Sequence, residues 1–301
     1  MGAVPPGGKV VVVGNGPVML LAAKRAALEG YDTHVVAAAS ASRYNELLYS
    51  MPFEGETIEG LTLVEQITGD AEPAFDELLA TCDALIIAVD GETCLSDGLV
   101  DVVLPTTSTA KRVVAMSRNL NGKGMGPFVV ASKTAANNEV WACNGEAKKA
   151  YQSFEAKIKS KAASLTADVV IARAGTLKGG GCGDVTSEEF STGTGTAKFG
   201  LADAFYKEGN QDIVNWRMLY DIQACGVSLE KGDTVAGPGF TGVFAATSES
   251  ASAGDTSRIA MAAAMVYALR EEKGGYDFSV ASTDSRVPPS ELEWGLLFSK
   301  L

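Results

Sequence analysis

The chain has 301 residues, of which 46% are hydrophobic and 21% charged, and its formal net charge is −12. This length allows one large domain, or one domain with a smaller lobe, and the composition is that of a globular protein. The negative charge argues against binding to nucleic acid or to an anionic membrane surface, because both need basic residues. No stretch approaches the roughly 20 apolar residues that a transmembrane helix requires.

The cysteine and histidine content limits the chemistry that we expect. The five cysteines form no CxxC pair, and His34, which falls within a predicted strand, is the only histidine. A metal site built from these residues, or a histidine-based catalytic triad, is therefore not expected. An odd number of cysteines fits reduced thiols in the cytosol or an organelle matrix better than a disulfide framework. The first eight residues show no signal or transit peptide, although one already removed would leave no trace.

Short aliphatic runs alternate with helical patterns through about residue 175. Strands are predicted for KVVVVG (9–14), DTHVVAAA (32–39), LTLVEQITG (61–69), DALIIAVD (83–90), PFVVAS (127–132) and DVVIARAG (168–175). Helices are predicted for residues 17–30, 73–82, 106–120 and 146–165. Strands that are almost continuously apolar and alternate with helices indicate an α/β fold, a doubly wound parallel sheet covered on both faces.

The texture changes after Gly175, where glycine- and threonine-rich loops separate shorter elements. A helix is predicted within residues 255–275, followed by a strand YDFSVAS (276–282) and a final segment WGLLFSKL (294–301). We interpret the chain as one domain with a core over residues 8–178. Residues 179–301 are predicted to form a small C-terminal lobe at the carboxyl edge of the sheet.

The stretch VVVVGNGPVM predicts a nucleotide site. Gly14 ends the first strand, Gly16 would let a pyrophosphate approach the backbone, and Pro17 suits the first position of a helix. The N-terminus of that helix offers free amides and a partial positive charge to phosphates. Met19 stands where dinucleotide-binding proteins usually carry a third glycine. We favour nucleotide binding over the alternative, a tight strand–helix turn without a ligand.

The second predicted strand ends without the acidic residue that usually binds the ribose hydroxyls of NAD. Ser40, Ser42 and Arg43 lie just beyond it instead. Hydroxyl and guanidinium groups suit a 2′-phosphate, so NADP is preferred over NAD as the cofactor. The alternative is that Arg43 only begins a solvated helix.

Five landmarks in order resemble the atypical short-chain dehydrogenase/reductases, NAD(P)-binding Rossmann proteins related to plant and algal plastid reductases. They are the glycine loop, ITGDAEPAFDELLATCDALIIAVDG, GPFVVASK, ADVVIARAGTLKGG and TSRIAMAAAMVYAL. The loop has one residue fewer between its first glycines than the family's GxxGxxG, and Ala174 replaces a family proline. The resemblance implies a Rossmann-like fold. It also implies a set of cofactor-binding residues: Gly14, Asn15, Gly16, Pro17, Val18 and Met19 at the phosphates, Ala38 and Ser40 near the ribose, Ala88 and Val89 beside the adenosine, and Ser132 near the nicotinamide.

The reductases of that family use a Tyr-xxx-Lys pair, in which the lysine lowers the tyrosine pKa and the tyrosine donates a proton. The best match here is Tyr151, a candidate catalytic residue, but Glu155 stands at the lysine position. A carboxylate there would oppose the role of the tyrosine, so we interpret Tyr151 as a core residue.

Two classes of function follow. In the first, the protein binds NAD(P) without catalysis, or with weak catalysis. It would then serve as an accessory or assembly subunit of a larger photosynthetic or respiratory complex, as some family members do. In the second, it is an NAD(P)H-dependent oxidoreductase with another proton donor.

Overall fold

The computed structural model describes residues 2–36, 58–64, 72–90, 95, 97–123, 126–127, 131, 145–178, 226–237, 254–285 and 287–301. The strands are β1 (Lys9–Asn15), β2 (Asp32–Val36), β3 (Leu61–Val64), β4 (Ala84–Val89), β5 (Arg112–Arg118), β6 (Asp168–Ala174), β7 (Thr176–Lys178), β8 (Gly226–Lys231), β9 (Asp255–Ser257) and β10 (Tyr276–Thr283). The helices are α1 (Pro17–Leu28), α3 (Glu72–Thr81), α4 (Asp97–Val103), α6 (Gly145–Ser164), α11 (Arg258–Arg270) and α12 (Glu291–Phe298).

Eight of the strands form one sheet in the order β3-β2-β1-β4-β5-β6-β10-β8. All neighbours in it are parallel except β10 and β8, which pair antiparallel at one edge. The strands β7 and β9 form a separate parallel pair. The sheet is therefore doubly wound, as the alternation of strands and helices predicts.

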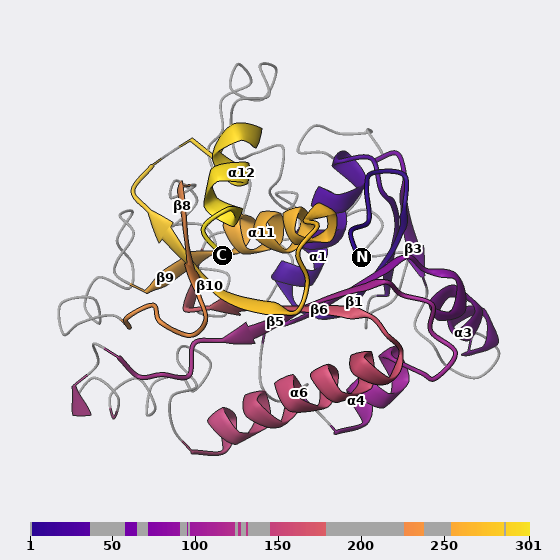
Figure 1. Ribbon diagram of the computed structural model, residues 1–301, viewed down its shortest axis with the longest axis horizontal. Helices are drawn as coiled ribbons and strands as arrows, with labels where there is room; N and C mark the ends of the chain where they lie inside the picture. Colours follow the sequence, from indigo (N-terminus) through magenta and orange to yellow (C-terminus); the bar gives the residue numbers. More distant parts are fainter. Residues whose placement is uncertain are drawn as a thin grey trace, which may run out of the picture.

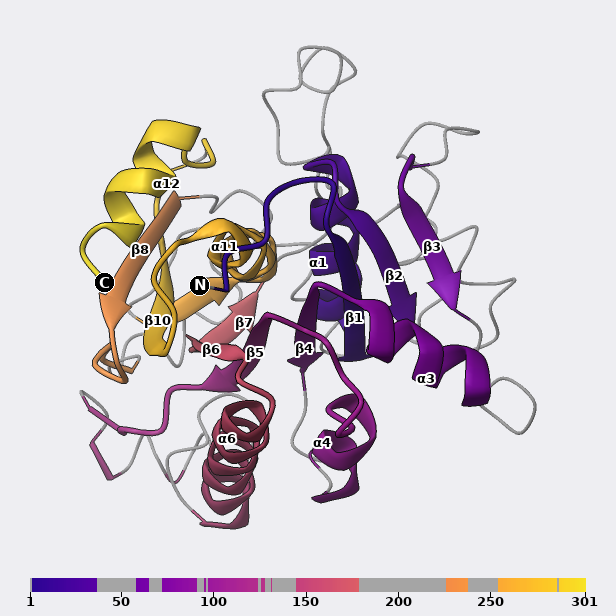
Figure 2. The same ribbon diagram turned by 45° about the vertical axis from the view of Figure 1, so that its right-hand side comes forward.

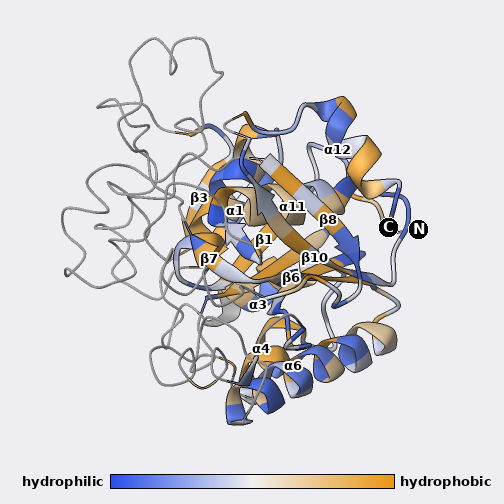
Figure 3. Cartoon of the chain, turned by 90° about the vertical axis from the view of Figure 1, so that its left-hand side faces the viewer, coloured by the Kyte–Doolittle hydropathy of each residue, from blue (hydrophilic) through white to orange (hydrophobic). Residues whose placement is uncertain are grey.

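Helices cover both faces of this sheet. The helices α1 and α11 lie on one face, and α4 and α6 lie on the other (Figure 1). Alternate residues of β1 serve the two faces: Val10 and Val12 pack toward α1 and α11, while Val11 and Val13 pack with the residues of the opposite face. A strand buried on both faces needs apolar residues at every position, which explains the uninterrupted run of valines. The helix α6, by contrast, is apolar only on the side that faces the sheet, and its outward face is hydrophilic (Figure 3).

The fifth strand is not the one that the sequence predicts. The strand β5 is RVVAMSR, residues 112–118, which we assigned to a helix, and all seven of its residues are buried. Residues 127 and 131 of the expected strand 127–132 are helical. A short apolar run fits a buried strand and a buried helix equally well, and the alanine and methionine in this run favoured the wrong choice.

The C-terminal part of the chain contributes to the central sheet. The strand β10 pairs with β6, β8 pairs with β10, and α11 packs against α1, as Figure 2 shows. The helix expected within residues 255–275 and the strand expected at 276–282 are thus confirmed. That the other residues of 179–301 form a small C-terminal lobe stays a prediction. In the described ranges, no helix has the length and apolar character needed to cross a membrane.

Candidate functional site

The candidate site lies where the strand order reverses. From β1 the chain builds β2 and β3 on one side, and it then crosses to β4 and the remaining strands on the other. In sheets of this kind, ligands bind outside the carboxyl ends of the strands at this reversal point. Here β1 and β4 are direct neighbours, with Gly14 opposite Ala88 and Asn15 opposite Val89. The glycine loop therefore lies at the place where the topology predicts a ligand.

The two glycines of the loop are fixed by backbone geometry. Gly14 has a φ of 135°, and a methyl group at its Cα would lie 1.8 Å from the carbonyl oxygen of Ala88. Gly16 has a φ of 84° and is the N-cap of α1, with Pro17 at the first helical position. Both backbone conformations favour glycine, and the proline loses no hydrogen bond there. Pro17 lies at the first helical position as predicted, whereas β1 ends at Asn15, one residue later than predicted, and phosphate binding by this loop stays a prediction.

Met19 packs into the hydrophobic core. Its side chain is 3% exposed and belongs to the cluster that α1 and α11 form over the sheet. The absence of a third glycine therefore affects the packing of α1. Ala88 and Val89 are also fully buried in this structure, as the last two residues of β4.

The structure places an acidic residue, which the sequence analysis did not select, against the glycine loop. Asp90 directly follows β4, and its Oδ1 accepts a hydrogen bond from the Val18 amide at 3.3 Å. A methyl group at Gly16 would lie 2.7 Å from Cβ and Cγ of Asp90. The Asp90 amide in turn donates to Oδ1 of Asn15 at 3.2 Å. The first turn of α1, which has no acidic residue of its own, thus faces this carboxylate.

Two guanidinium groups hold Asp90 from the other side. Nε of Arg258, the first residue of α11, lies 3.4 Å from Oδ2 of Asp90. Arg118, the last residue of β5, donates to the backbone carbonyls of Asp90 and Gly175. The Asp90 side chain is 15% exposed. Burial raises the pKa of its carboxyl group, and the nearby charges of Arg258 and Arg118 oppose that rise.

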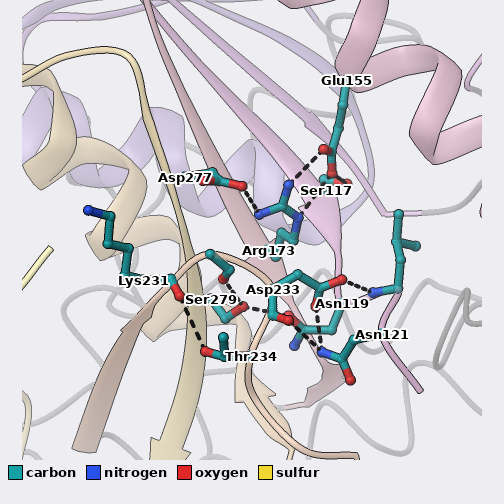
Figure 4. Close-up of polar contacts among 12 residues, drawn as sticks. Ser117, Asn119, Asn121, Glu155, Arg173, Lys231, Asp233, Thr234, Asp277 and Ser279 are labelled. Carbon is teal, nitrogen blue, oxygen red and sulfur yellow. Dashed lines mark hydrogen bonds and ion pairs between the residues drawn. The ribbon is translucent and has the colours of Figure 1, made fainter. Parts of the chain in front are cut away.

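A second polar cluster joins the ends of β5, β6 and β10 to α6 (Figure 4). Ser117 donates to Oε1 of Glu155 at 2.7 Å, and Arg173 binds both carboxylate oxygens of Glu155, at 3.1 and 2.7 Å. Arg173 also pairs with Asp277. Burial lowers the pKa of Arg173, but the bonds to the two carboxylates outweigh it and the net shift is upward. Arg173 thus makes structural contacts at the end of its strand: it links β6 to α6 and β10, and Glu155 extends the cluster to β5 through Ser117.

Tyr151 is buried on the same helix. Its side chain is 1% exposed and packs with Leu120 in a small hydrophobic cluster. Glu155, one turn further along α6, is 8% exposed and is taken up by Arg173 and Ser117. Glu155, which the sequence analysis set against the lysine of a Tyr-xxx-Lys pair, thus belongs to a buried ion pair, and the tyrosine is enclosed by side chains.

Several predicted residues fall outside the part of the chain that the structure describes. These are Ala38, Ser40, Arg43 and Ser132. The strand whose end was expected to carry Ser132 is not the fifth strand of the sheet, and the serine near the end of the observed fifth strand is Ser117. His34 lies half-buried in β2, with Nε2 3.2 Å from a carboxylate oxygen of Asp32.

Comparison with known proteins identifies the fold. No protein-family model and no curated protein sequence matches this chain. A solved protein from Bacteroides thetaiotaomicron, designated an epimerase, is 14% identical over 92% of this chain and 97% of its own, with a TM-score of 0.52. A solved protein from Lactococcus lactis, designated an oxidoreductase, is 10% identical over 97% of both chains, with a TM-score of 0.52. The chain therefore has the Rossmann-like α/β fold of these proteins.

The backbone of the glycine turn has a geometry suited to a dinucleotide, whereas one side chain, that of Asp90, carries a charge that would repel it. The glycine turn and the N-terminus of α1 have the geometry that receives a pyrophosphate. The carboxylate of Asp90, however, already accepts a hydrogen bond from the Val18 amide at that helix end. The chain thus has the elements of a diphosphate site and supplies an anion of its own to it.

Proposed function

We propose that this protein binds an NAD(P) dinucleotide at the glycine loop and does not reduce substrates by Tyr–Lys chemistry. We further propose that it acts as a non-catalytic or weakly catalytic accessory subunit. The observation that carries this proposal is the buried bond of Glu155 to Arg173 at the position where a reductase would hold its lysine. A lysine there stabilises the ionised tyrosine, whereas a carboxylate cannot do so. The Tyr151 hydroxyl belongs to a side chain that is 1% exposed.

The fold and the glycine turn support a dinucleotide as the ligand. The reversal of strand order places Gly14 and Gly16 at the start of α1, where phosphates bind in sheets of this type. The proposal of NADP over NAD rests on the sequence alone, on Ser40 and Arg43 after the second strand.

The alternative is an NAD(P)H-dependent oxidoreductase, which the fold shared with proteins designated an oxidoreductase and an epimerase favours. Hydride transfer from NADPH to a panel of carbonyl substrates tests it, with Tyr151→Phe beside the wild type. Loss of a general acid commonly lowers the rate by about 10²–10⁴-fold. We expect no NADPH-dependent turnover that depends on Tyr151. Wild-type turnover that collapses in Tyr151→Phe would overturn the accessory-subunit proposal.

Purification from the native source provides an independent test. An accessory subunit is expected to elute in a complex with a stoichiometric protein partner, and a free oxidoreductase is expected to elute alone. Elution only as a free chain, together with measurable turnover, would favour the oxidoreductase.

A further inference from the structure

The N-terminus of α1 is where the fold places an anionic ligand, and the chain already places a carboxylate there. Oδ1 of Asp90 takes the Val18 amide at 3.3 Å, and its Cβ and Cγ lie against Gly16. The other oxygen, Oδ2, lies 3.4 Å from Nε of Arg258. Asp90 thus holds two of the groups that a pyrophosphate in this loop would use, a helix amide and a guanidinium.

We propose that Asp90 lowers the affinity of the dinucleotide site, because its carboxylate competes with the diphosphate for the amide of Val18 and for Arg258. The proposal rests on the proposed function, because it assumes that the glycine loop is the binding site. The Asp90 carboxylate and a diphosphate in the same loop are both negatively charged, and such charges repel strongly where water is partly excluded. A dinucleotide must therefore displace the carboxylate or bind when it is protonated, and wild-type affinity is weak for that reason.

Within the part of the chain that the structure describes, the groups that face Asp90 come from four elements. They are Arg258 from α11, Arg118 from β5, the Val18 amide from α1 and Asn15 from β1. The two charged groups in this set are cations, so removing the negative charge of Asp90 leaves positive charge at the mouth of the loop. A diphosphate gains from that charge, because the repulsion from Asp90 is gone and the guanidinium of Arg258 no longer faces a carboxylate at this position.

The experiment is a calorimetric titration of NADPH and NADH into the wild type, Asp90→Asn and Asp83→Asn. Asparagine keeps the shape and the acceptor oxygen of Asp90 while it removes the charge. Asp83 precedes β4 as Asp90 follows it, and it bonds to Lys111 and to the Lys9 amide at the far end of the sheet. The control therefore changes the net charge equally, away from the loop. We expect Asp90→Asn to bind at least about tenfold more tightly than the wild type, and Asp83→Asn to match the wild type within about twofold.

The outcomes separate this inference from the proposed function. If the wild type and both variants bind equally, Asp90 does not set affinity, although the dinucleotide site stands. If folded Asp90→Asn binds neither dinucleotide at millimolar concentration, both the inference and the dinucleotide site are wrong. Thermal unfolding of each variant shows whether it is folded, and Asp90→Ser, which keeps a short neutral acceptor, replaces Asp90→Asn if that variant does not fold.

A second arm compares the wild type with Asp90→Asn and uses NAD⁺, whose diphosphate stays ionised in mild acid. Burial raises the pKa of the Asp90 carboxyl group, so acidification neutralises it at a higher pH than an ordinary aspartate. At an ionic strength that screens the net charge of the chain, the affinity of the wild type is expected to rise more than that of Asp90→Asn as the pH falls. An equal pH dependence of affinity in the two proteins would overturn the proposal.

Discussion

Two carboxylates, the half-buried Asp90 and the buried Glu155, lie at the carboxyl edge of the sheet, and a guanidinium group pairs with each of them. Their roles differ because their neighbours differ. Glu155 is bound by Arg173 and Ser117 at a cross-link between elements. Asp90 instead accepts a hydrogen bond from the Val18 amide in the first turn of α1. In a sequence, an aspartate or a glutamate is compatible with both roles, a structural cross-link and a place beside a ligand site. The contacts in the structure decide which role applies.

The ion pair of Glu155 with Arg173 is predicted to support the fold. Removing one partner of a buried pair leaves the other charge uncompensated, which typically costs about 3–5 kcal/mol. We expect Glu155→Gln to lower the free energy of unfolding by about 3 kcal/mol in urea denaturation. The matched control is Glu146→Gln on the same helix, an exposed residue paired with Lys149, which should change stability by less than about 0.5 kcal/mol. Equal losses in the two variants would show that the buried pair has no special role.

The pKa of Asp90 predicts how stability changes with pH. Because the folded pKa is raised, the folded state holds more protons than the unfolded state above about pH 4, and stability falls as the pH rises through the folded pKa. Asp90→Asn lacks this loss. We therefore expect the stability of Asp90→Asn relative to the wild type to increase from pH 4 towards neutral pH in urea denaturation. A difference that stays constant over that range would contradict the upward shift.

At the scale of elements, the crossing from β1 to α1 depends on Gly14. Its φ of 135° and the 1.8 Å approach to the Ala88 carbonyl leave no room for a side chain. Gly14→Ala is expected to destabilise the fold by more than about 3 kcal/mol, because backbone of β1 or β4 must move. Gly7→Ala is the control, since Gly7 has a φ of 90° but nothing within 4 Å of the added methyl group. It should cost only about 1 kcal/mol, the strain of the backbone conformation. Thermal or urea unfolding measures both, and similar losses would contradict the steric argument.

The type of an element, helix or strand, could be predicted where the residues at its ends gave a strong signal. The prediction failed where that signal was weak. The strands β1, β4 and β6 consist mostly of β-branched and aliphatic residues and have a glycine or an aspartate next to their last residue, and the sequence predicted each of them. The strand β5 contains alanine, methionine and two arginines, and its character comes from burial between β4 and β6. That burial is a tertiary property, which a short apolar run does not encode.

For the whole molecule, the class of fold followed from the sequence and the site followed only in part. The alternation of strands and helices predicted a doubly wound sheet, and the order of its strands confirms it. The contacts of the site join residues far apart in the sequence: Val18 to Asp90, and Arg173 to Asp277. The position of Asp90 after a strand placed it at the carboxyl edge, but its contact with α1 depends on β1 and β4 being neighbours. Pair contacts of this kind need the three-dimensional arrangement.

The central claim is that a dinucleotide binds at the glycine loop, and amide NMR during a titration tests it most directly. NADPH is added to the ¹⁵N-labelled chain while the backbone amides are followed. We predict that the amides of Gly16, Val18 and Met19 shift together and saturate, because a pyrophosphate at the N-terminus of α1 must contact them. Shifts confined to other regions, or no shift at millimolar NADPH in either the wild type or Asp90→Asn, would contradict the claim.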